Sequence, residues 1–198
     1  MSKILTWQES IIRREDREKR QNHKSAAIWF TGLSGAGKST IAYAVESAIF
    51  NAGGNSYVLD GDNVRHGLCS DLSFSLEDRA ENLRRIGETA KLFVDAGIIV
   101  LAAFISPLQR ERERTRAIFN GNDFIEVYCN ASIEVCESRD TKGLYKMARK
   151  GQIRDFTGIS SPYEIPEAPD LSINTGEENI EDCVEKIVEA LKERRIIK

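Results

Sequence analysis

Short apolar runs alternate with longer amphipathic stretches along most of this chain. The runs occupy residues 26–30, 56–60, 98–104, 124–128 and 171–173. Each has the length of a buried strand, and most stretches between them carry apolar residues at three- and four-residue steps, the period of a helix. Strands separated by helices predict an α/β fold, in which a mainly parallel five-stranded sheet is covered by helices on both faces as a three-layer sandwich.

Glycine and proline positions predict where the helices begin and end. The helix over residues 39–52 is followed by two glycines, and the helix over residues 83–94 is followed by Gly97. Glycine readily adopts the left-handed conformation that ends a helix. Pro107 suits the first turn of a third helix, over residues 107–119. A last helix follows the fifth strand.

A charge-rich segment precedes the alternating pattern. Residues 1–24 are polar, mix both signs of charge and predict an N-terminal arm or helix. No linker rich in proline, glycine or serine divides the remainder, so we expect residues 25–198 to form one domain. Residues 141–162 show no strong period and contain five Lys and Arg residues. This stretch is typical of a flexible basic lid that closes over phosphates.

Composition and charge exclude several classes of protein. The net charge is −3 and the pI is near 5.6, so the chain as a whole lacks the positive field of a nucleic-acid binder. The longest uninterrupted apolar run, residues 98–105, is far shorter than the roughly 20 residues of a membrane span. The four cysteines form no Cys-x-x-Cys pair and only two histidines are present, which indicates neither a zinc site nor disulfides. We expect a cytoplasmic protein without nucleic-acid or membrane partners.

A glycine-rich loop joins the first predicted strand to the first predicted helix. Residues 32–39 read GLSGAGKS and match Gly-x-x-x-x-Gly-Lys-Ser in the strand–loop–helix context that this pattern requires. Glycines let backbone N–H groups turn toward phosphate oxygens, and the helix start adds its positive dipole end. Lys38 should bridge the β- and γ-phosphates, and Ser39 should place its hydroxyl on Mg²⁺. The residues predicted to bind MgATP are Gly32, Leu33, Ser34, Gly35, Ala36, Gly37, Lys38, Ser39 and Thr40.

The acidic residues favour a kinase over a GTPase switch or a motor. The chain contains no Asn-Lys-x-Asp sequence, which specifies guanine, and the strand over 98–104 is not followed by the acidic pair common in motor ATPases. Acids lie at the end of the second strand instead, at Asp60 and Asp62, where side chains can face the terminal phosphate across the carboxyl edge of the sheet. Asp62 is our preferred carboxylate for the acceptor proton, with Asp60 as the alternative base and the expected metal residue beside Ser39.

Six short motifs follow one another along the chain. They read FTGLSG at 30–35, DGDNVRHGL at 60–68, DRAENLRR at 78–85, FISP at 104–107, KGLYK at 142–146 and FTGI at 156–159. In this order they closely resemble the adenylyl-sulfate kinase family, and the resemblance extends from Thr6 to the final helix. It implies a P-loop kinase fold and transfer of the ATP γ-phosphoryl group to the 3′-hydroxyl of adenylyl sulfate, forming 3′-phosphoadenylyl sulfate in sulfate assimilation. It further implies Mg²⁺, a homodimer, and ATP sulfurylase as a functional partner.

The resemblance also implies residue roles. Arg139 would face the adenine of ATP, and Phe74 and Phe156 would clamp the adenine of adenylyl sulfate. The full set implied for this second nucleotide is Asp62, Arg65, Phe74, Arg79, Asn82, Ile105, Ser106, Lys142 and Phe156. Residue spacing agrees in part, because Arg79 and Asn82 are three apart and share one face of a predicted helix. Both phenylalanines lie in polar segments, which favours contact with a ligand over core packing.

Ser106 has two interpretations. The resemblance marks it as a catalytic candidate, the site of a phosphoserine intermediate. Direct in-line transfer does not need such an intermediate, and the position before Pro107 is typical of a helix N-cap, which is the interpretation we prefer. The next two residues, Leu108 and Gln109, depart from the family pattern, in which an aromatic residue and an arginine are frequent.

Two other functions stay open from the sequence. A P-loop kinase for another metabolite, such as a nucleoside or a carboxylated alcohol, would need the same loop and acids, although paired phenylalanines favour a planar base. A non-catalytic ATP-dependent regulatory module is the second alternative. ADP release that depends on an acceptor would distinguish a kinase from such a module.

Overall fold

Five parallel strands form one sheet in the computed structural model, which describes residues 6 and 8–198. The strands are β1 (Ala27–Thr31), β2 (Ser56–Asp60), β3 (Ile99–Ala103), β4 (Phe124–Cys129) and β5 (Leu171–Ile173). Their order is β2-β3-β1-β4-β5, and every neighbouring pair is parallel. The predicted α/β fold with a parallel five-stranded sheet is confirmed.

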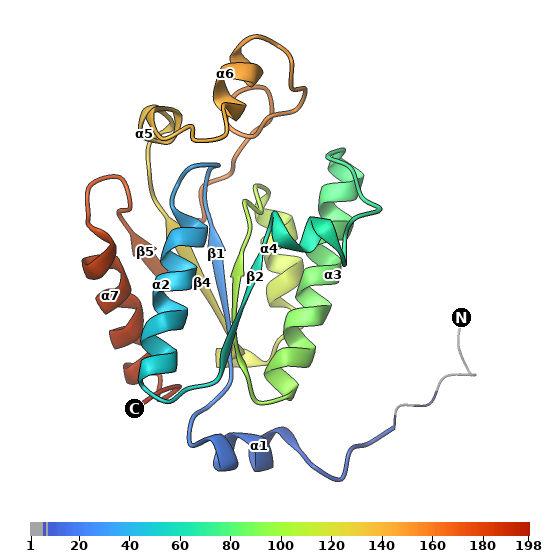
Figure 1. Ribbon diagram of the computed structural model, residues 1–198. Coiled ribbons are helices and arrows are strands. Elements are labelled where there is room, and N and C mark those ends of the chain that lie inside the picture. The colour runs from blue at the N-terminus through green and yellow to red at the C-terminus, as the bar shows by residue number, and fades with distance from the viewer. Residues whose placement is uncertain (1–5, 7) are drawn as a thin grey trace.

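Helices cover both faces of this sheet (Figure 1). One face carries α2 (Lys38–Asn51) and α7 (Ile180–Glu193), and the other carries α3 (Leu76–Asp95) and α4 (Gln109–Arg116). Beyond the ends of the strands lie α1 (Arg14–Gln21), α5 (Ile133–Ser138) and α6 (Leu144–Arg149). Two short 3-10 turns are η1 (Asn63–His66) and η2 (Gly121–Asp123). Within the described residues, every helix is either too short or too polar to cross a lipid bilayer.

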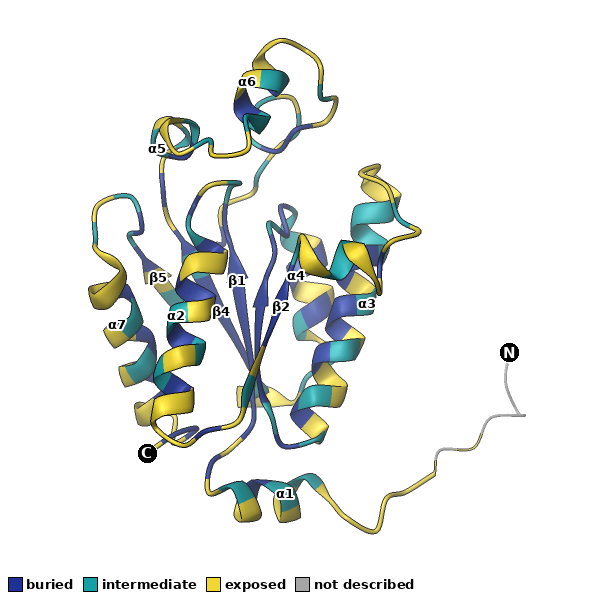
Figure 2. Ribbon diagram, viewed as in Figure 1, coloured by how far each residue is buried: buried dark blue, intermediate teal, exposed yellow. Residues whose placement is uncertain are grey.

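The central strand β1 is buried on both faces. Ile28 and Phe30 lie in the apolar cluster beneath α2 and α7, whereas Ala27 and Trp29 lie in the cluster beneath α3. Figure 2 shows the same division, with dark blue strands between helices whose outer faces are yellow. A strand covered on both sides needs apolar residues at every position, which is why its sequence is continuous rather than alternating.

Helix boundaries differ from the prediction at α3 and α4. The helix α3 begins at Leu76, earlier than predicted, because the side chain of Ser75 caps it by accepting a hydrogen bond from the Asp78 N–H. The helix α4 begins only after Leu108, which is its N-cap, and it ends at Arg116 rather than at residue 119.

The prediction that Ser106 caps α4 is wrong. Ser106 lies before the N-cap, in the left-handed backbone region with φ 38°. Its Oγ accepts a hydrogen bond from the indole Nε1 of Trp29 at 3.1 Å. Local sequence favoured a cap, but the tertiary approach of β1 provides this hydroxyl with a different partner.

The N-terminal arm contains a docked helix. The helix α1 lies at the end of the molecule opposite the carboxyl ends of the strands (Figure 1). Arg14 forms hydrogen bonds with both carboxylate oxygens of Asp123, and the buried carboxylate of Glu18 accepts from the backbone N–H of Ser25 at 2.9 Å and pairs with Lys24 at 2.8 Å. Residues 1–5 and 7 of the predicted arm lie outside the described residues.

Candidate active site

The glycine-rich loop follows β1 and leads directly into α2 at the carboxyl edge of the sheet. Gly35 and Gly37 have φ values of 78° and 83°. A Cβ atom at Gly35 would lie 2.8 Å from the carbonyl oxygen of Cys136, closer than packing allows. The loop therefore needs glycine for both its backbone angles and its close contacts.

Lys38 is buried at the base of this loop. Its Nζ donates hydrogen bonds to the carbonyl oxygens of Gly32 at 3.0 Å and Leu33 at 2.7 Å. Burial lowers the pKa of Lys38, and the nearby carboxylates of Asp60 and Asp62 offset part of this lowering. Carbonyl dipoles only partly compensate the ammonium charge, so an anionic phosphate would be a better partner.

Ser39 and Asp60 meet at the start of α2. The Ser39 Oγ donates to one carboxylate oxygen of Asp60 at 2.6 Å. The other carboxylate oxygen accepts from the backbone N–H groups of Asp62 at 3.0 Å and Asn63 at 3.3 Å. The structure thus brings together the two residues predicted for the metal. A hydroxyl and a carboxylate beside a phosphate-binding loop are the hard oxygen donors that Mg²⁺ prefers.

Asp62 forms an ion pair with Lys142. The two side chains come from the turn after β2 and from the start of the predicted lid, and both are exposed. The lid segment 141–162 itself stands beyond the carboxyl ends of the strands in Figure 1 and contains α6, where the sequence showed no helical period. The structure therefore places Asp62, the residue preferred as the base, next to Lys142 of the predicted lid.

Arg65 and Phe74 stack on each other. The Arg65 guanidinium lies 4.3 Å from the ring centroid of Phe74, which is a cation–π contact, and it donates to the carbonyl oxygen of Ser73 at 2.9 Å. The Phe74 side chain is 63 % exposed. A large aromatic ring left in water beside a cation fits a site for a planar anionic ligand.

Arg79 ties α3 to the lid instead of pairing with a neighbouring acid. Its guanidinium donates to the carbonyl oxygens of Phe74 at 2.8 Å and Asp155 at 2.6 Å and to the hydroxyl of Thr157 at 3.1 Å. Burial lowers its pKa. On the same helix, Asn82 is buried at 4 % exposure, and its Nδ2 has no hydrogen-bond partner among the described residues. A buried amide with an unused donor is costly, and a polar ligand would satisfy it.

Phe156 lies in a different environment from Phe74. It is only 8 % exposed, and its ring packs edge-to-face against Tyr145 of α6 with centroids 5.0 Å apart. Its polar sequence neighbours therefore do not make Phe156 an exposed residue, and contact of its other ring face with a ligand stays a prediction. Tyr145 supplies the missing apolar partner from elsewhere in the lid.

Ile105 and Arg139 are the last two of the predicted site residues. The carbonyl oxygen of Ile105 accepts from the hydroxyl of Thr31 at 2.8 Å. Arg139, at the end of α5, donates to the carbonyl oxygen of Thr175 at 2.8 Å, and the Thr175 hydroxyl donates to Ala36 of the phosphate loop at 2.8 Å. Arg139 is therefore connected to the loop through the segment after β5.

Comparison with known proteins identifies the family. The family model described as adenylylsulphate kinase matches residues 24–174. An adenylyl-sulfate kinase of Prochlorococcus marinus is 58 % identical over 194 residues, covering 98 % of this chain and 96 % of the relative. The chain belongs to the adenylyl-sulfate kinase family. The resemblance inferred from the six motifs is confirmed.

Solved structures agree with this family membership. The APS kinase of Mycobacterium tuberculosis in complex with AMPPNP and APS is 46 % identical, with a TM-score of 0.83 over 86 % of this chain and 99 % of that one. A gluconokinase from Sinorhizobium meliloti, at 17 % identity and a TM-score of 0.58, shares the fold alone. The predicted P-loop kinase fold is confirmed.

Three residues that were given no role in the sequence analysis also connect parts of the site: Tyr145, Arg112 and Glu126. The Tyr145 hydroxyl donates to the Ser34 carbonyl oxygen at 2.9 Å, which joins the lid to the phosphate loop. Arg112 and Glu126 form a buried ion pair, with Nε and Oε1 2.9 Å apart. Only Glu126 left a signal in the sequence, as a charged residue inside an otherwise apolar strand.

Proposed function

We propose that this chain transfers the γ-phosphoryl group of ATP to the 3′-hydroxyl of adenylyl sulfate. As a member of its family it is an ATP-dependent adenylyl-sulfate kinase. The observation that carries the proposal is the 2.6 Å contact between Ser39 and Asp60 directly beside the buried ammonium of Lys38. The Mycobacterium tuberculosis relative, which holds an ATP analogue together with APS, supports the same pair of substrates here.

On the donor side, the loop residues 32–40 bind the phosphates of ATP. Lys38 exchanges its two carbonyl partners for the β- and γ-phosphate oxygens, because full anionic charge outweighs carbonyl dipoles. Ser39 and Asp60 would hold Mg²⁺, which would neutralise charge on the transferring group. Arg139 lies against the adenine of ATP.

On the acceptor side, Arg65, Arg79 and Lys142 supply positive charge for adenylyl sulfate. The proton of its 3′-hydroxyl passes to Asp62, which must first separate from Lys142. The remaining members of the proposed acceptor pocket are Phe74, Asn82, Ile105, Ser106 and Phe156. The unused amide donor of Asn82 and the exposed ring of Phe74 support this assignment.

Transfer is direct, without a phosphoserine at Ser106. That side chain is 2 % exposed and its hydroxyl is bound to the Trp29 indole, so it is poorly placed to attack ATP. In-line transfer between two bound nucleotides requires only alignment and charge neutralisation.

Residues 25–198 act as one domain, and its lid, residues 141–162, closes over the phosphates. The protein works in the cytoplasm, in sulfate assimilation. All four cysteines are buried free thiols, in keeping with a reducing compartment. We further propose a homodimer that receives its acceptor from an ATP sulfurylase. A relative from Thiobacillus denitrificans, at 30 % identity and a TM-score of 0.68, is a hexameric APS kinase of which this chain covers 32 %.

The test is a substrate panel. Purified protein is incubated with MgATP and either adenylyl sulfate, a nucleoside, gluconate or no acceptor, and ADP and phosphorylated product are measured. We expect ADP only with adenylyl sulfate, and none after EDTA treatment. ADP release without any acceptor would favour a regulatory ATPase, and preference for another acceptor would replace the proposed substrate.

A further inference from the structure

The turn between β3 and α4 adopts a conformation that its own sequence does not favour. Ser106 has φ 38°, a left-handed angle that side chains other than glycine rarely adopt. The turn lies beside the proposed base, because the N–H of Gly61 donates to the carbonyl oxygen of Ala103 at 3.1 Å and Phe104 packs against Gly61. Something must hold this turn in place at the acceptor side of the site.

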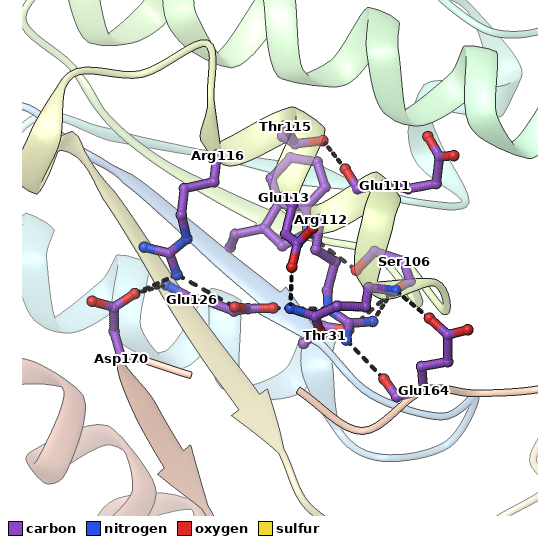
Figure 3. A network of polar contacts seen from close by, with 12 residues as sticks. Thr31, Ser106, Glu111, Arg112, Glu113, Thr115, Arg116, Glu126, Glu164 and Asp170 are labelled. Carbon is purple, nitrogen blue, oxygen red and sulfur yellow. Dashed lines mark hydrogen bonds and ion pairs between the residues drawn. The ribbon is translucent and has the colours of Figure 1, made fainter. Parts of the chain in front are cut away.

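Arg112 holds the Ser106 turn in place through hydrogen bonds to backbone carbonyl oxygens. It is 1 % exposed, and its Nη1 donates to the carbonyl oxygen of Ser106 at 2.8 Å. Its Nη2 donates to the carbonyl oxygen of Glu164 at 2.8 Å and to the side chain of Gln109 at 2.5 Å. Figure 3 shows the guanidinium between these segments. One planar group thus bridges the acceptor turn and the chain that leaves the lid.

Additional contacts reinforce the same bridge. The Glu164 N–H donates to the carbonyl oxygen of Pro107 at 2.8 Å, and the Glu164 carboxylate accepts from the Gln109 N–H at 2.6 Å. Next to Glu164, the Tyr163 hydroxyl lies 3.0 Å from the hydroxyl of Thr31. The segment directly after residues 141–162 is therefore fastened to the turn that carries Ser106.

The carboxylate of Glu126 compensates the buried positive charge of Arg112. Its Oε1 lies 2.9 Å from Arg112 Nε, although neither atom has an aligned hydrogen-bond partner, so charge rather than hydrogen-bond geometry holds this pair. Arg116 lies 3.3 Å from the other oxygen of Glu126 and 2.7 Å from Asp170. The balance of charge leaves the two Nη groups of Arg112 free to hold backbone carbonyls.

We infer that Arg112 is a positioning residue for the acceptor. Its guanidinium joins Glu164, just after the proposed lid, to the Ser106 turn and so shapes the acceptor side of the site. The inference rests on the proposed function. Lysine could keep the charge against Glu126, but a single ammonium cannot reach the carbonyls of Ser106 and Glu164 in the same planar geometry.

The decisive variant is Arg112→Lys, with Arg116→Lys as the matched control. Both changes lie on α4 and keep the charge beside Glu126, but Arg116 does not contact the turn. We expect Arg112→Lys to raise KM for adenylyl sulfate about tenfold, with KM for ATP within twofold of the unchanged protein. Arg116→Lys should leave both KM values within twofold.

Two outcomes would overturn the inference: an equal rise in both KM values, or the same acceptor-specific rise in Arg116→Lys. If Arg112→Lys does not fold, the double change Arg112→Met with Glu126→Gln decides, because it removes the guanidinium together with the buried charge that it faces. It should raise KM for adenylyl sulfate about tenfold with KM for ATP within twofold, and no rise in the acceptor KM would refute the inference. Failure of the unchanged protein to phosphorylate adenylyl sulfate would instead refute the proposed function.

Discussion

The buried carboxylate of Glu18 gives a quantitative test of how α1 is held against the domain. Burial alone would raise its pKa, but hydrogen bonds from Lys24 and Ser25 and the charge of Arg14 outweigh burial and lower it from 4.5 to about 2. At about 1.4 kcal/mol for each tenfold change in the dissociation constant, the ionised carboxylate contributes about 3 kcal/mol to folding at neutral pH. Glu18→Gln should lose most of this.

The pH dependence has a defined sign. Because the pKa is lower in the folded protein, the stabilisation is fully present above pH 4.5 and is lost as the pH falls from 4.5 toward 2. Urea unfolding of the unchanged protein and of Glu18→Gln should therefore differ by a constant amount between pH 6 and 8. The difference should shrink by about two fifths at pH 3.5. A loss of about 3 kcal/mol should lower the melting temperature by roughly 6 to 12 °C.

Glu15→Gln is the matched control, because Glu15 lies exposed on the same helix and the change removes the same charge. It should cost less than about 0.5 kcal/mol. Since α1 lies opposite the phosphate loop (Figure 1), kcat of Glu18→Gln at pH 7 should stay within twofold. Equal losses in the two variants, or a gap that does not shrink at pH 3.5, would refute the reasoning.

Three further predictions concern the site. Lys38→Met should lower kcat at least 1,000-fold with an unchanged circular dichroism spectrum, because the variant lacks the positive charge that contacts the transferring phosphate. Normal turnover would exclude the loop as the ATP site. Phe74→Ala should weaken adenylyl sulfate binding by about 1 to 3 kcal/mol in calorimetry and leave ATP binding unchanged. Ser106→Ala should retain turnover but lose about 1 to 3 kcal/mol of stability, since the Trp29 indole N–H loses its partner. With ATP chiral at the γ-phosphorus, direct transfer predicts inversion, and retention would make Ser106 the nucleophile.

Local sequence determined the elements of this protein and the donor half of its site. The predicted strands over residues 56–60 and 171–173 coincide with β2 and β5. The phosphate loop and the acids at the end of β2 could be recognised because their chemistry depends on residues adjacent in the chain. Six ordered motifs were enough to identify the family.

Only the tertiary structure decided which distant groups become partners. Ser106 resembled a helix cap and instead binds Trp29, and Phe156, although it lies in a polar stretch of sequence, is buried against Tyr145. Glu126 could be recognised as unusual within a strand, but nothing nearby in sequence identified Arg112 as its partner. Such contacts form between segments that meet only after the sheet is ordered β2-β3-β1-β4-β5, so their energies depend on long-range packing that local propensity does not encode.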